Sequence, residues 1–342
     1  MNFIVVGAGS IGCYVGGRLA AAGSSVWFVG RPRVADVLAR DGLRISDLEG
    51  YAAHIAPGQL HLAGSVAEAW SQARAAAGES VPTVVLLAVK GGATAAAATE
   101  IGAACAPGTT VVSLQNGVEN VGRIQSAAPR LNAIAGMVPY NVVALKPSHV
   151  HRGTGGQLAF QDGPASREFL PVFEAAGLRA RLYGDMVSVQ WGKLLLNLNN
   201  PVNALSDLPL RDQLLDRNLR RVLAALQVEA LGIMQRAGIQ PAQVGMVAPH
   251  VLPRILRLPN WIFRRVAQRM LRMDAKARSS MWEDLQQGRT TEIDDLCGAV
   301  VRLASQHGTR APLNEAMCRL VAGHQRGVAL SGPALRAALG MG

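Results

Sequence analysis

Short apolar runs alternate with helical periodicity through the first half of the chain. Strand-like apolar runs occupy residues 2–7, 25–30, 83–89, 109–114 and 132–138. Apolar residues at three- and four-residue intervals, typical of amphipathic helices, occur over 10–22, 65–77, 92–104 and 117–127. This alternation predicts an α/β domain with a doubly wound parallel sheet, because parallel neighbours are joined by crossover helices.

Two further stretches carry turn signals between short alternating runs. Residues 41–63 contain three glycine turns and predict a small β excursion. Residues 139–163 predict strands added to the edge of the sheet. A helix near 166–176 and a strand near 179–183 would complete the domain.

The pattern changes after Tyr183-Gly184-Asp185, because helical periodicity then dominates and strand signals vanish. We therefore expect an N-terminal α/β domain over 1–184 and a C-terminal all-helical domain over 185–330. The last residues, 331–342, are rich in small side chains and predict a frayed tail.

A glycine motif follows the first strand and opens the first helix. In this context the first glycine suits a tight turn, the second lets the backbone approach a pyrophosphate, and the third allows close packing of helix on strand. The helix N-terminus offers N–H groups and partial positive charge to the phosphates. A glycine turn without a ligand is the alternative interpretation. The residues expected at the dinucleotide are Gly7, Ala8, Gly9, Ser10, Ile11 and Gly12.

Polar residues stand at the carboxyl ends of three later strands, where ligands bind in such folds. Arg31 follows the second strand and favours NADP(H), because arginine accommodates the 2′-phosphate. Lys90 follows the strand at 83–89 and suits phosphate or adenine contacts, or is a plain strand-end lysine. Asn116 follows the strand at 109–114, where it either caps the next helix or lies at the nicotinamide and substrate.

Lysine is rare here: the four are Lys90, Lys146, Lys193 and Lys276. Lys193 and Asn197 are four residues apart among leucines and share one helical face. Burial would lower the lysine pKa and make it a usable proton donor to a carbonyl oxygen, whereas a lysine at a helix edge would simply extend to solvent. Further on, Thr290 or Thr291 can cap a helix that carries Glu292 in its first turn.

Composition narrows the class of protein. The content of 49% hydrophobic and 17% charged residues is typical of a globular protein and argues against disorder. No apolar run is long enough to span a bilayer, and no signal-peptide pattern is present. The cysteines form no CxxC pair, so we expect buried, reduced thiols in a cytoplasmic protein and no metal ion: Cys13, Cys105, Cys297 and Cys318.

The net charge of +11 is concentrated in residues 251–280. This segment has a single acid, Asp274, and eight bases: Arg254, Arg257, Arg264, Arg265, Arg269, Arg272, Lys276 and Arg278. No recognition motif accompanies it, so we expect no nucleic-acid partner. The neighbouring Trp261-Ile262-Phe263 would suit a helix on a membrane surface. We favour a solvated basic face near a site for anionic ligands. Apolar runs at 252–258 and 261–266 are consistent with a homodimer.

Taken together, these blocks resemble the NADPH-dependent ketopantoate reductase family (2-dehydropantoate 2-reductase) over nearly the whole chain. The specific part is the order and spacing of WGKLLLN at 191–197 and SSMWEDL…RTTEID at 279–294. The resemblance implies that Lys193 is the general acid, that Glu292 holds the substrate hydroxyl and orients the lysine, and that Asn116 lies at the junction of nicotinamide and substrate. The residues it implies at the substrate's polar ends are Asn197, Asn200 and Ser280.

The chain departs from the family pattern at two places. The second asparagine usually stands eight residues after the lysine, where this chain has Pro201. A one-residue shift would give that role to Asn200, and without a shift the role is empty or falls to Asn203. An asparagine three residues before the serine is replaced by Ala277. The leading hypothesis is reduction of ketopantoate to pantoate, a step toward pantothenate and coenzyme A. The alternatives are an NADPH-dependent reductase of another 2-oxo acid and a non-catalytic NADP(H)-binding sensor.

Overall fold

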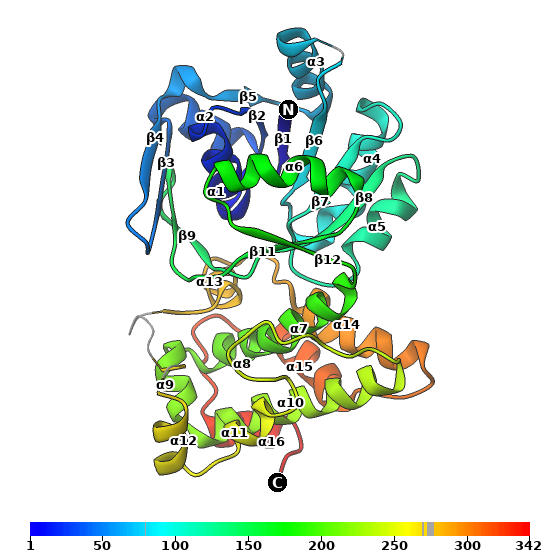
Figure 1. Cartoon of the computed structure of the whole chain (residues 1–342). Helices are drawn as coiled ribbons and strands as arrows, with labels where there is room; N and C mark the ends of the chain where they lie inside the picture. Colours follow the sequence, from blue (N-terminus) through cyan, green and yellow to red (C-terminus); the bar gives the residue numbers. More distant parts are fainter. Residues whose placement is uncertain (79, 269, 272–276) are drawn as a thin grey trace. The chain divides into compact units, whose positions relative to one another are not determined.

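The computed structural model describes residues 1–78, 80–268, 270–271 and 277–342 (Figure 1). The chain divides into two compact units, Met1–Met186 and Val187–Gly342.

The first unit is built on an eight-stranded sheet in the order β12-β11-β8-β7-β6-β1-β2-β5. β1 (Asn2–Val6) lies inside it, parallel to both β2 (Ser25–Val29) and β6 (Thr83–Leu87). The remaining parallel strands are β5 (His61–Ala63), β7 (Thr110–Ser113) and β8 (Asn132–Met137). At one edge, β11 (Leu158–Gln161) runs antiparallel to β8 and parallel to β12 (Ala180–Tyr183). This topology confirms the predicted parallel sheet, since the strands wind outward in both directions from β1.

Helices cover both faces of this sheet because its strands are apolar on both sides. Phe3 and Val5 of β1 belong to one core, and Ile4 and Val6 to the other. The first core is closed by α1 (Ser10–Ala21) and α6 (Pro164–Ala175). The second is closed by α3 (Val66–Ala77), α4 (Thr94–Ala104) and α5 (Asn120–Ala127). The predicted helices therefore all form, within a few residues of the expected ends.

A second, four-stranded sheet in the order β4-β3-β10-β9 contains the predicted β excursion within 41–63 and corrects the prediction for 139–163. Within 41–63, β3 (Leu43–Asp47) and β4 (Ala52–Ile55) form a hairpin of this sheet, but β5 joins the main sheet. Within 139–163, β9 (Val142–Lys146) and β10 (His149–Arg152) join the second sheet, and only β11 extends the main one. The sequence pattern also missed α2 (Pro32–Asp41) and the short η1 (Pro57–Gln59).

A buried ionic cluster fastens the second sheet to α1. Oδ2 of Asp47 lies 3.1 Å from Arg18 of α1 and 3.2 Å from Arg152 of β10. The guanidinium of Arg18 also lies 3.6 Å from the centroid of the Tyr51 ring. The contact between Asp47 and Arg152 joins residues 105 positions apart in the sequence.

The described elements of the second unit are all helices, as the sequence predicts. The longest, α10 (Arg217–Arg236), packs against several of the others. The rest are α7 (Met186–Asn197), α8 (Asn199–Ser206), α9 (Leu210–Leu215), α11 (Leu252–Leu256), α12 (Asn260–Val266), α13 (Ser280–Gln286), α14 (Ile293–Gln306), α15 (Pro312–Ala322) and α16 (Gly332–Ala338). In the described part of the chain, none of the helices has both the length and the apolar character to cross a membrane.

The C-terminal residues correct the expectation of a frayed tail. Ser331 caps α16, with its hydroxyl accepting from the N–H of Ala334. Leu335 and Leu339 are buried, and α16 packs against α10. The alanine-rich composition hid two leucines at the four-residue spacing of a helix face.

Three of the four cysteines are buried thiols, as expected, and Cys318 is partly exposed instead. None of these four cysteines forms a disulfide bond.

Candidate active site

The glycine turn after β1 has the geometry that the motif predicts. Gly7 has φ of +104°, and a Cβ on it would lie 2.7 Å from backbone atoms of Ala88 and Val89 at the end of β6. A Cβ on Gly12 would collide with the carbonyl oxygen of Gly7. Both glycines are therefore required by the fold itself, because only they let the turn, the helix and β6 approach so closely.

Gly9 differs from its neighbours because the fold does not require it. Its φ of −82° suits any residue, and a Cβ there would have no atom within 4 Å. It is the N-cap of α1 but provides no side-chain cap for the first N–H groups of that helix. An open approach to exposed N–H groups at a helix N-terminus fits the pyrophosphate of a dinucleotide. Ala8, Ser10 and Ile11 complete this turn.

The structure brings three of the predicted residues to the same edge of the sheet. Arg31 follows β2, Lys90 follows β6 and Asn116 comes shortly after β7. These strands and β1 form the order β7-β6-β1-β2, and parallel strands end at one edge. The connections leave β1 in opposite directions here, which is where ligands bind in open α/β sheets.

Asn116 does not cap the following helix, contrary to the alternative considered above. α5 begins at Asn120, and its N-cap is Glu119. Asn120 instead donates from Nδ2 to the carbonyl oxygen of Asn116, at 2.8 Å. The backbone of Asn116 is thus held by a buried side chain one turn later.

A buried polar network that the sequence pattern did not reveal supports this edge. Nε2 of Gln115 donates to the carbonyl oxygen of Val89 at 2.9 Å and to the hydroxyl of Thr94 at 2.7 Å. The same hydroxyl donates to Oδ1 of Asn120 at 2.9 Å. The network fixes the residues on both sides of Lys90 and Asn116. The available signal was a run of polar residues after two apolar strands, but their mutual contacts are a tertiary property.

Arginines occupy an electrostatically unfavourable end of α2. Arg31 is its N-cap, Arg33 lies in its first turn, and both are exposed. No acidic residue stands in that turn. Cations at a helix N-terminus are repelled by the helix dipole, so this arrangement suits an anion placed between them.

The second unit carries the predicted general acid on α7. Lys193 and Asn197 both lie on this helix, which confirms that they are one turn apart. Trp191, Leu194 and Leu195 around them are buried. Burial lowers the pKa of Lys193 to about 8. An ammonium with a pKa this close to neutrality can release its proton at physiological pH.

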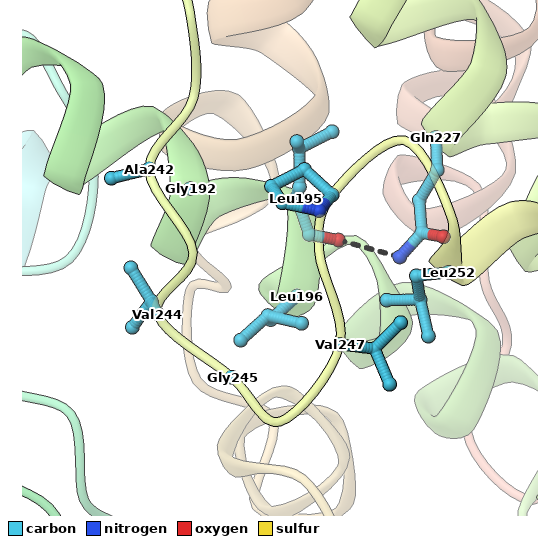
Figure 2. A pocket seen from close by; sticks show the side chains of 10 residues that line it. Gly192, Leu195, Leu196, Gln227, Ala242, Val244, Gly245, Val247 and Leu252 are labelled. Carbon is cyan, nitrogen blue, oxygen red and sulfur yellow. Dashed lines mark hydrogen bonds between the residues drawn. The ribbon is translucent and has the colours of Figure 1, made fainter.

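Other residues of α7 line a small pocket (Figure 2). Contacts beside this pocket hold the helix against α10 and the loop that follows it. Nε2 of Gln227, a buried residue of α10, donates to the carbonyl oxygen of Leu195 at 2.9 Å. Gly192 lies against the loop that contains Ala242, and a Cβ there would collide with the Ala242 carbonyl oxygen. The amide of Ala242 in turn donates to the carbonyl of Ser188 at 2.8 Å. Gln227 and Gly192 are thus supporting residues that the sequence pattern did not identify.

The two candidate amides of α8 have different surroundings. Asn203 is fully buried; its Oδ1 accepts from the N–H of Ser279 and its Nδ2 donates to the carbonyl of Leu208, both at 2.8 Å. Asn200 is only partly buried, and its carbonyl accepts from the hydroxyl of Ser279 at 3.3 Å. The amide of Asn203 is committed to these structural bonds, which leaves Asn200 as the candidate for substrate.

Ser280 and Glu292 both stand at helix starts. Ser280 is the exposed first residue of α13, directly after the N-cap Ser279. Glu292 is itself the N-cap of α14, which begins at Ile293, so neither Thr290 nor Thr291 is the cap. The helix starts later than predicted, at the first apolar residue after the threonines.

The described part of the basic segment packs against α10. Arg220 of α10 is fully buried and donates to the carbonyls of Leu256 and Leu258 and to Oδ1 of Asn260, within 3.0 Å. Phe263 is also buried, whereas 74% of Trp261 is exposed, so the apolar triplet does not form one exposed face. The remaining expected bases, Arg269, Arg272 and Lys276, and the acid Asp274 lie outside the described residues.

Comparison with known sequences decides the family. The family model described as "Ketopantoate reductase PanE/ApbA" matches residues 3–165, and the model of the family's C-terminal domain matches residues 185–325. The chain belongs to the ketopantoate reductase family. It is therefore an oxidoreductase that acts on CH–OH groups.

Several proteins named 2-dehydropantoate 2-reductase align with the chain over almost its whole length. A 2-dehydropantoate 2-reductase of Halobacterium salinarum is 26% identical over 333 residues, covering 95% of this chain and 99% of the relative. One of Mycobacterium tuberculosis is 27% identical over 320 residues, covering 93% and 96%.

Solved structures share the fold. A PanE/ApbA family ketopantoate reductase from Ralstonia eutropha JMP134 has a TM-score of 0.77 and 26% identity, covering 94% of this chain and 97% of that one. A D-mandelate dehydrogenase, described with NADH and anilino(oxo)acetate, has a TM-score of 0.74 at 18% identity and covers 94% and 97%. The latter likeness concerns the fold alone.

Proposed function

We propose that this ketopantoate reductase family member uses NADPH to reduce 2-dehydropantoate to pantoate, with Lys193 as the general acid. The reaction would belong to pantothenate and coenzyme A biosynthesis in the cytoplasm, and the enzyme would act as a homodimer. The observation that carries the proposal is Lys193 itself, a partly buried lysine on α7 whose pKa burial lowers to about 8.

The preference for NADPH is supported by the end of β2. Arg31 and Arg33 place two exposed cations at the start of α2 with no acid in the first turn. An acid at this point would favour the ribose 2′-hydroxyl of NAD, whereas arginine suits the 2′-phosphate. The open space at Gly9 and the N–H groups of α1 suit the pyrophosphate.

The chemistry of Lys193 follows from its protonation state. NADPH, when bound, supplies a hydride to the ketone carbon of the substrate. Negative charge then develops on the ketone oxygen, where the Lys193 ammonium stabilises it and donates the proton that completes the hydroxyl. A pKa near 8 keeps the group protonated at pH 7 but makes the proton easier to release than from an exposed lysine.

Other polar residues would orient the substrate. Asn197 and Asn200 would bind its polar groups, Ser280 its carboxylate, and Glu292 its hydroxyl while orienting the lysine. Asn116 would lie at the nicotinamide. The hydrogen-bonded link between the Ser279 hydroxyl and the Asn200 carbonyl joins two of these substrate-binding segments.

The direct test is oxidation of NADPH by the purified protein with 2-dehydropantoate, followed by absorbance and compared with NADH. We expect selective turnover with NADPH, and loss of turnover by about 10²-fold or more in Lys193→Ala. NADPH binding without turnover of any 2-oxo acid would contradict an enzymatic role and favour the sensor hypothesis.

A second candidate is a reductase of another 2-oxo acid by the same chemistry. Ala277 stands where the family resemblance expects an asparagine, so one polar contact to 2-dehydropantoate would be absent. A panel of branched, linear and aromatic 2-oxo acids separates the candidates. A kcat/KM for 2-dehydropantoate well above all others would exclude this second candidate.

A further inference from the structure

The segment that leads into α13 is bonded to the end of α8 and to the first residue of α9 by several hydrogen bonds. Residues 277–282 include the proposed carboxylate-binding Ser280. Upstream of it, the carbonyl of Ala277 accepts from the N–H of Leu210 at 2.8 Å. The remaining bonds come from Asn203 and Asp207, which are four residues apart at the end of α8 and its C-cap.

Asn203 bonds the backbone directly beside Ser280. Its Oδ1 accepts from the N–H of Ser279 at 2.8 Å, and its Nδ2 donates to the carbonyl of Leu208. The residue is fully buried, so these bonds form without competition from water. One amide therefore sets the distance between the end of α8 and the start of α13.

Asp207 accepts hydrogen bonds from residues on both sides of Ser279 and Ser280. Its Oδ1 accepts from Nε1 of Trp282 at 2.6 Å and from Nη1 of Arg278 at 3.1 Å. The Arg278 guanidinium also donates to the Asp207 carbonyl and lies 4.3 Å from the centroid of the Trp282 ring. Arg278, Trp282 and Asp207 thus form a closed clamp around Ser279 and Ser280.

The backbone of Asp207 has a left-handed conformation at the point where this clamp forms. Its φ is +53°, and among the described residues it is the only one other than glycine with a positive φ. The left-handed conformation is costly for such residues and persists where the surrounding contacts hold it, often at functional sites. Glycine would end α8 with less strain, but it could not accept the bonds from Arg278 and Trp282.

Within the clamp, Ser279 links the two substrate-binding segments. It is the N-cap of α13, with its Oγ accepting from the N–H of Trp282 at 3.2 Å. The same hydroxyl donates to the carbonyl of Asn200 at 3.3 Å. Any displacement of Ser279 would therefore move both Ser280 and the backbone of Asn200.

We propose that Asn203 and Asp207 are positioning residues that set Ser280 and Asn200 for the carboxylate of the 2-oxo acid. The inference rests on the proposed function, because it assigns the substrate-binding role to Ser280 and Asn200. It adds two residues that act through the α13 start rather than by touching substrate. It also explains why a strained aspartate closes α8 in place of glycine.

Asp207 allows a test that separates positioning from stability. Asp207→Gly removes the acceptor but relieves the positive φ, so we expect the thermal midpoint to change little. The KM for the 2-oxo acid should rise about tenfold or more, while the KM for NADPH stays within about twofold. Asp207→Asn keeps Oδ1 as an acceptor for Trp282 and should restore the substrate KM to within a few-fold of the wild type.

Asn203 is tested against a matched control, Asn314. Asn314 is also a fully buried amide of this unit, bonded to Leu226 and Glu229, but it contacts neither α8 nor α13 through these bonds. Asn203→Ala and Asn314→Ala should lower the thermal midpoint comparably. Only Asn203→Ala should raise the substrate KM.

The outcomes are distinguishable. A wild-type protein that turns over no 2-oxo acid would overturn the proposed function and this inference with it. An active wild type with an unchanged substrate KM in Asp207→Gly would overturn the positioning role alone. An equal rise of KM in Asn314→Ala would also overturn it, since general destabilisation would then account for the effect.

Discussion

Gln227 and Leu195 are joined by a buried hydrogen bond of 2.9 Å from a side-chain amide of α10 to a main-chain carbonyl of α7 (Figure 2). Leu195 is two residues after Lys193, so the bond fixes the turn that carries the proposed general acid. A carbonyl within a helix normally accepts from the helix alone. The additional donor from α10 restrains the rotation and translation of α7, which is the condition for a precisely placed proton donor.

The pKa of Lys193 predicts the alkaline limit of activity. Burial lowers this pKa to about 8, and a general acid must be protonated to act. The kcat/KM for the 2-oxo acid should therefore be highest below this value and fall as the pH rises through it. The check is a pH profile of kcat/KM with saturating NADPH.

Lys193→Arg provides the control for this profile. Arginine retains the charge but titrates far above the range of the experiment, and it is a poor proton donor. We expect a much lower kcat/KM with no decline near pH 8. A wild-type decline that persists unchanged in Lys193→Arg would assign the ionisation to another group.

A substitution at Gly9 should weaken cofactor binding without lowering the stability of the fold. The space around it is open and its φ of −82° is accessible to alanine, so Gly9→Ala should fold as stably as the wild type. Its methyl group would occupy the space through which a pyrophosphate approaches α1. We expect an affinity for NADPH at least about tenfold weaker, measured by calorimetry or fluorescence titration.

Substitutions at two further glycines serve as controls for Gly9→Ala. Gly122 in α5 is also open, and Gly122→Ala should leave NADPH binding unchanged while stabilising the helix by about 0.5–1 kcal/mol. Gly12→Ala should instead lower the thermal midpoint, because its methyl group collides with the Gly7 carbonyl. NADPH binding by Gly9→Ala at wild-type affinity would show that the open space is not the phosphate site.

The sequence predicted those parts of the fold in which local pattern and tertiary role coincide. The apolar run before Gly7 and the helical spacing after Gly12 correctly indicate the β1–α1 turn, because each glycine serves a local contact. The second sheet was missed because β3 and β10 pair across about a hundred residues, and periodicity does not name a strand's partner. A short strand such as β5 can belong to either sheet by pattern alone.

The same limit applies to side chains in the candidate site. Lys193 and Asn197 could be grouped from a four-residue spacing, since both lie on one helix. Asn200 and Asn203 could not be ranked, because only tertiary contacts show that both ends of the Asn203 amide are in use. Likewise, Arg220 reads as one more surface cation in a basic sequence, although it is fully buried under Phe263, with the ring centroid 4.0 Å from the guanidinium.

Arg31 predicts the basis of cofactor choice. Arg31→Ala should lower kcat/KM for NADPH by about 10–100-fold, because a charge-assisted hydrogen bond to the 2′-phosphate would be lost. The value for NADH should change little, since that cofactor lacks this phosphate. Initial rates with both cofactors at a fixed 2-oxo acid concentration measure the two effects.

The matched control for Arg31 lies on the same helix. Arg40 is exposed and paired with Asp41 at 2.8 Å near the end of α2. Arg40→Ala removes the same charge without changing the end of β2, so both kcat/KM values should stay at wild-type levels. An equal loss of NADPH activity in both variants would point to general electrostatic attraction rather than recognition at Arg31.

We expect the contribution of Asp47 to the stability of the first unit to depend on pH in the acid range. Burial alone would raise the pKa of Asp47, but N–H bonds from Tyr51 and Glu49 and the guanidinium of Arg152 hold it below its usual value. A carboxylate with a depressed pKa in the folded state stabilises that state above its unfolded pKa of about 4. This contribution is lost as the pH falls through the folded pKa.

Asp47→Asn should therefore destabilise the protein at pH 7 by about 3 kcal/mol, because it leaves Arg18 and Arg152 buried without their shared carboxylate. Denaturant unfolding at a series of pH values measures the difference from the wild type, which should shrink below about pH 4. Asp162→Asn is the matched control, since its ion pair with Arg167 at 2.8 Å lies at the surface and should contribute little. A difference between wild type and Asp47→Asn that stays constant down to pH 2 would mean that the carboxylate charge does not hold the second sheet to α1.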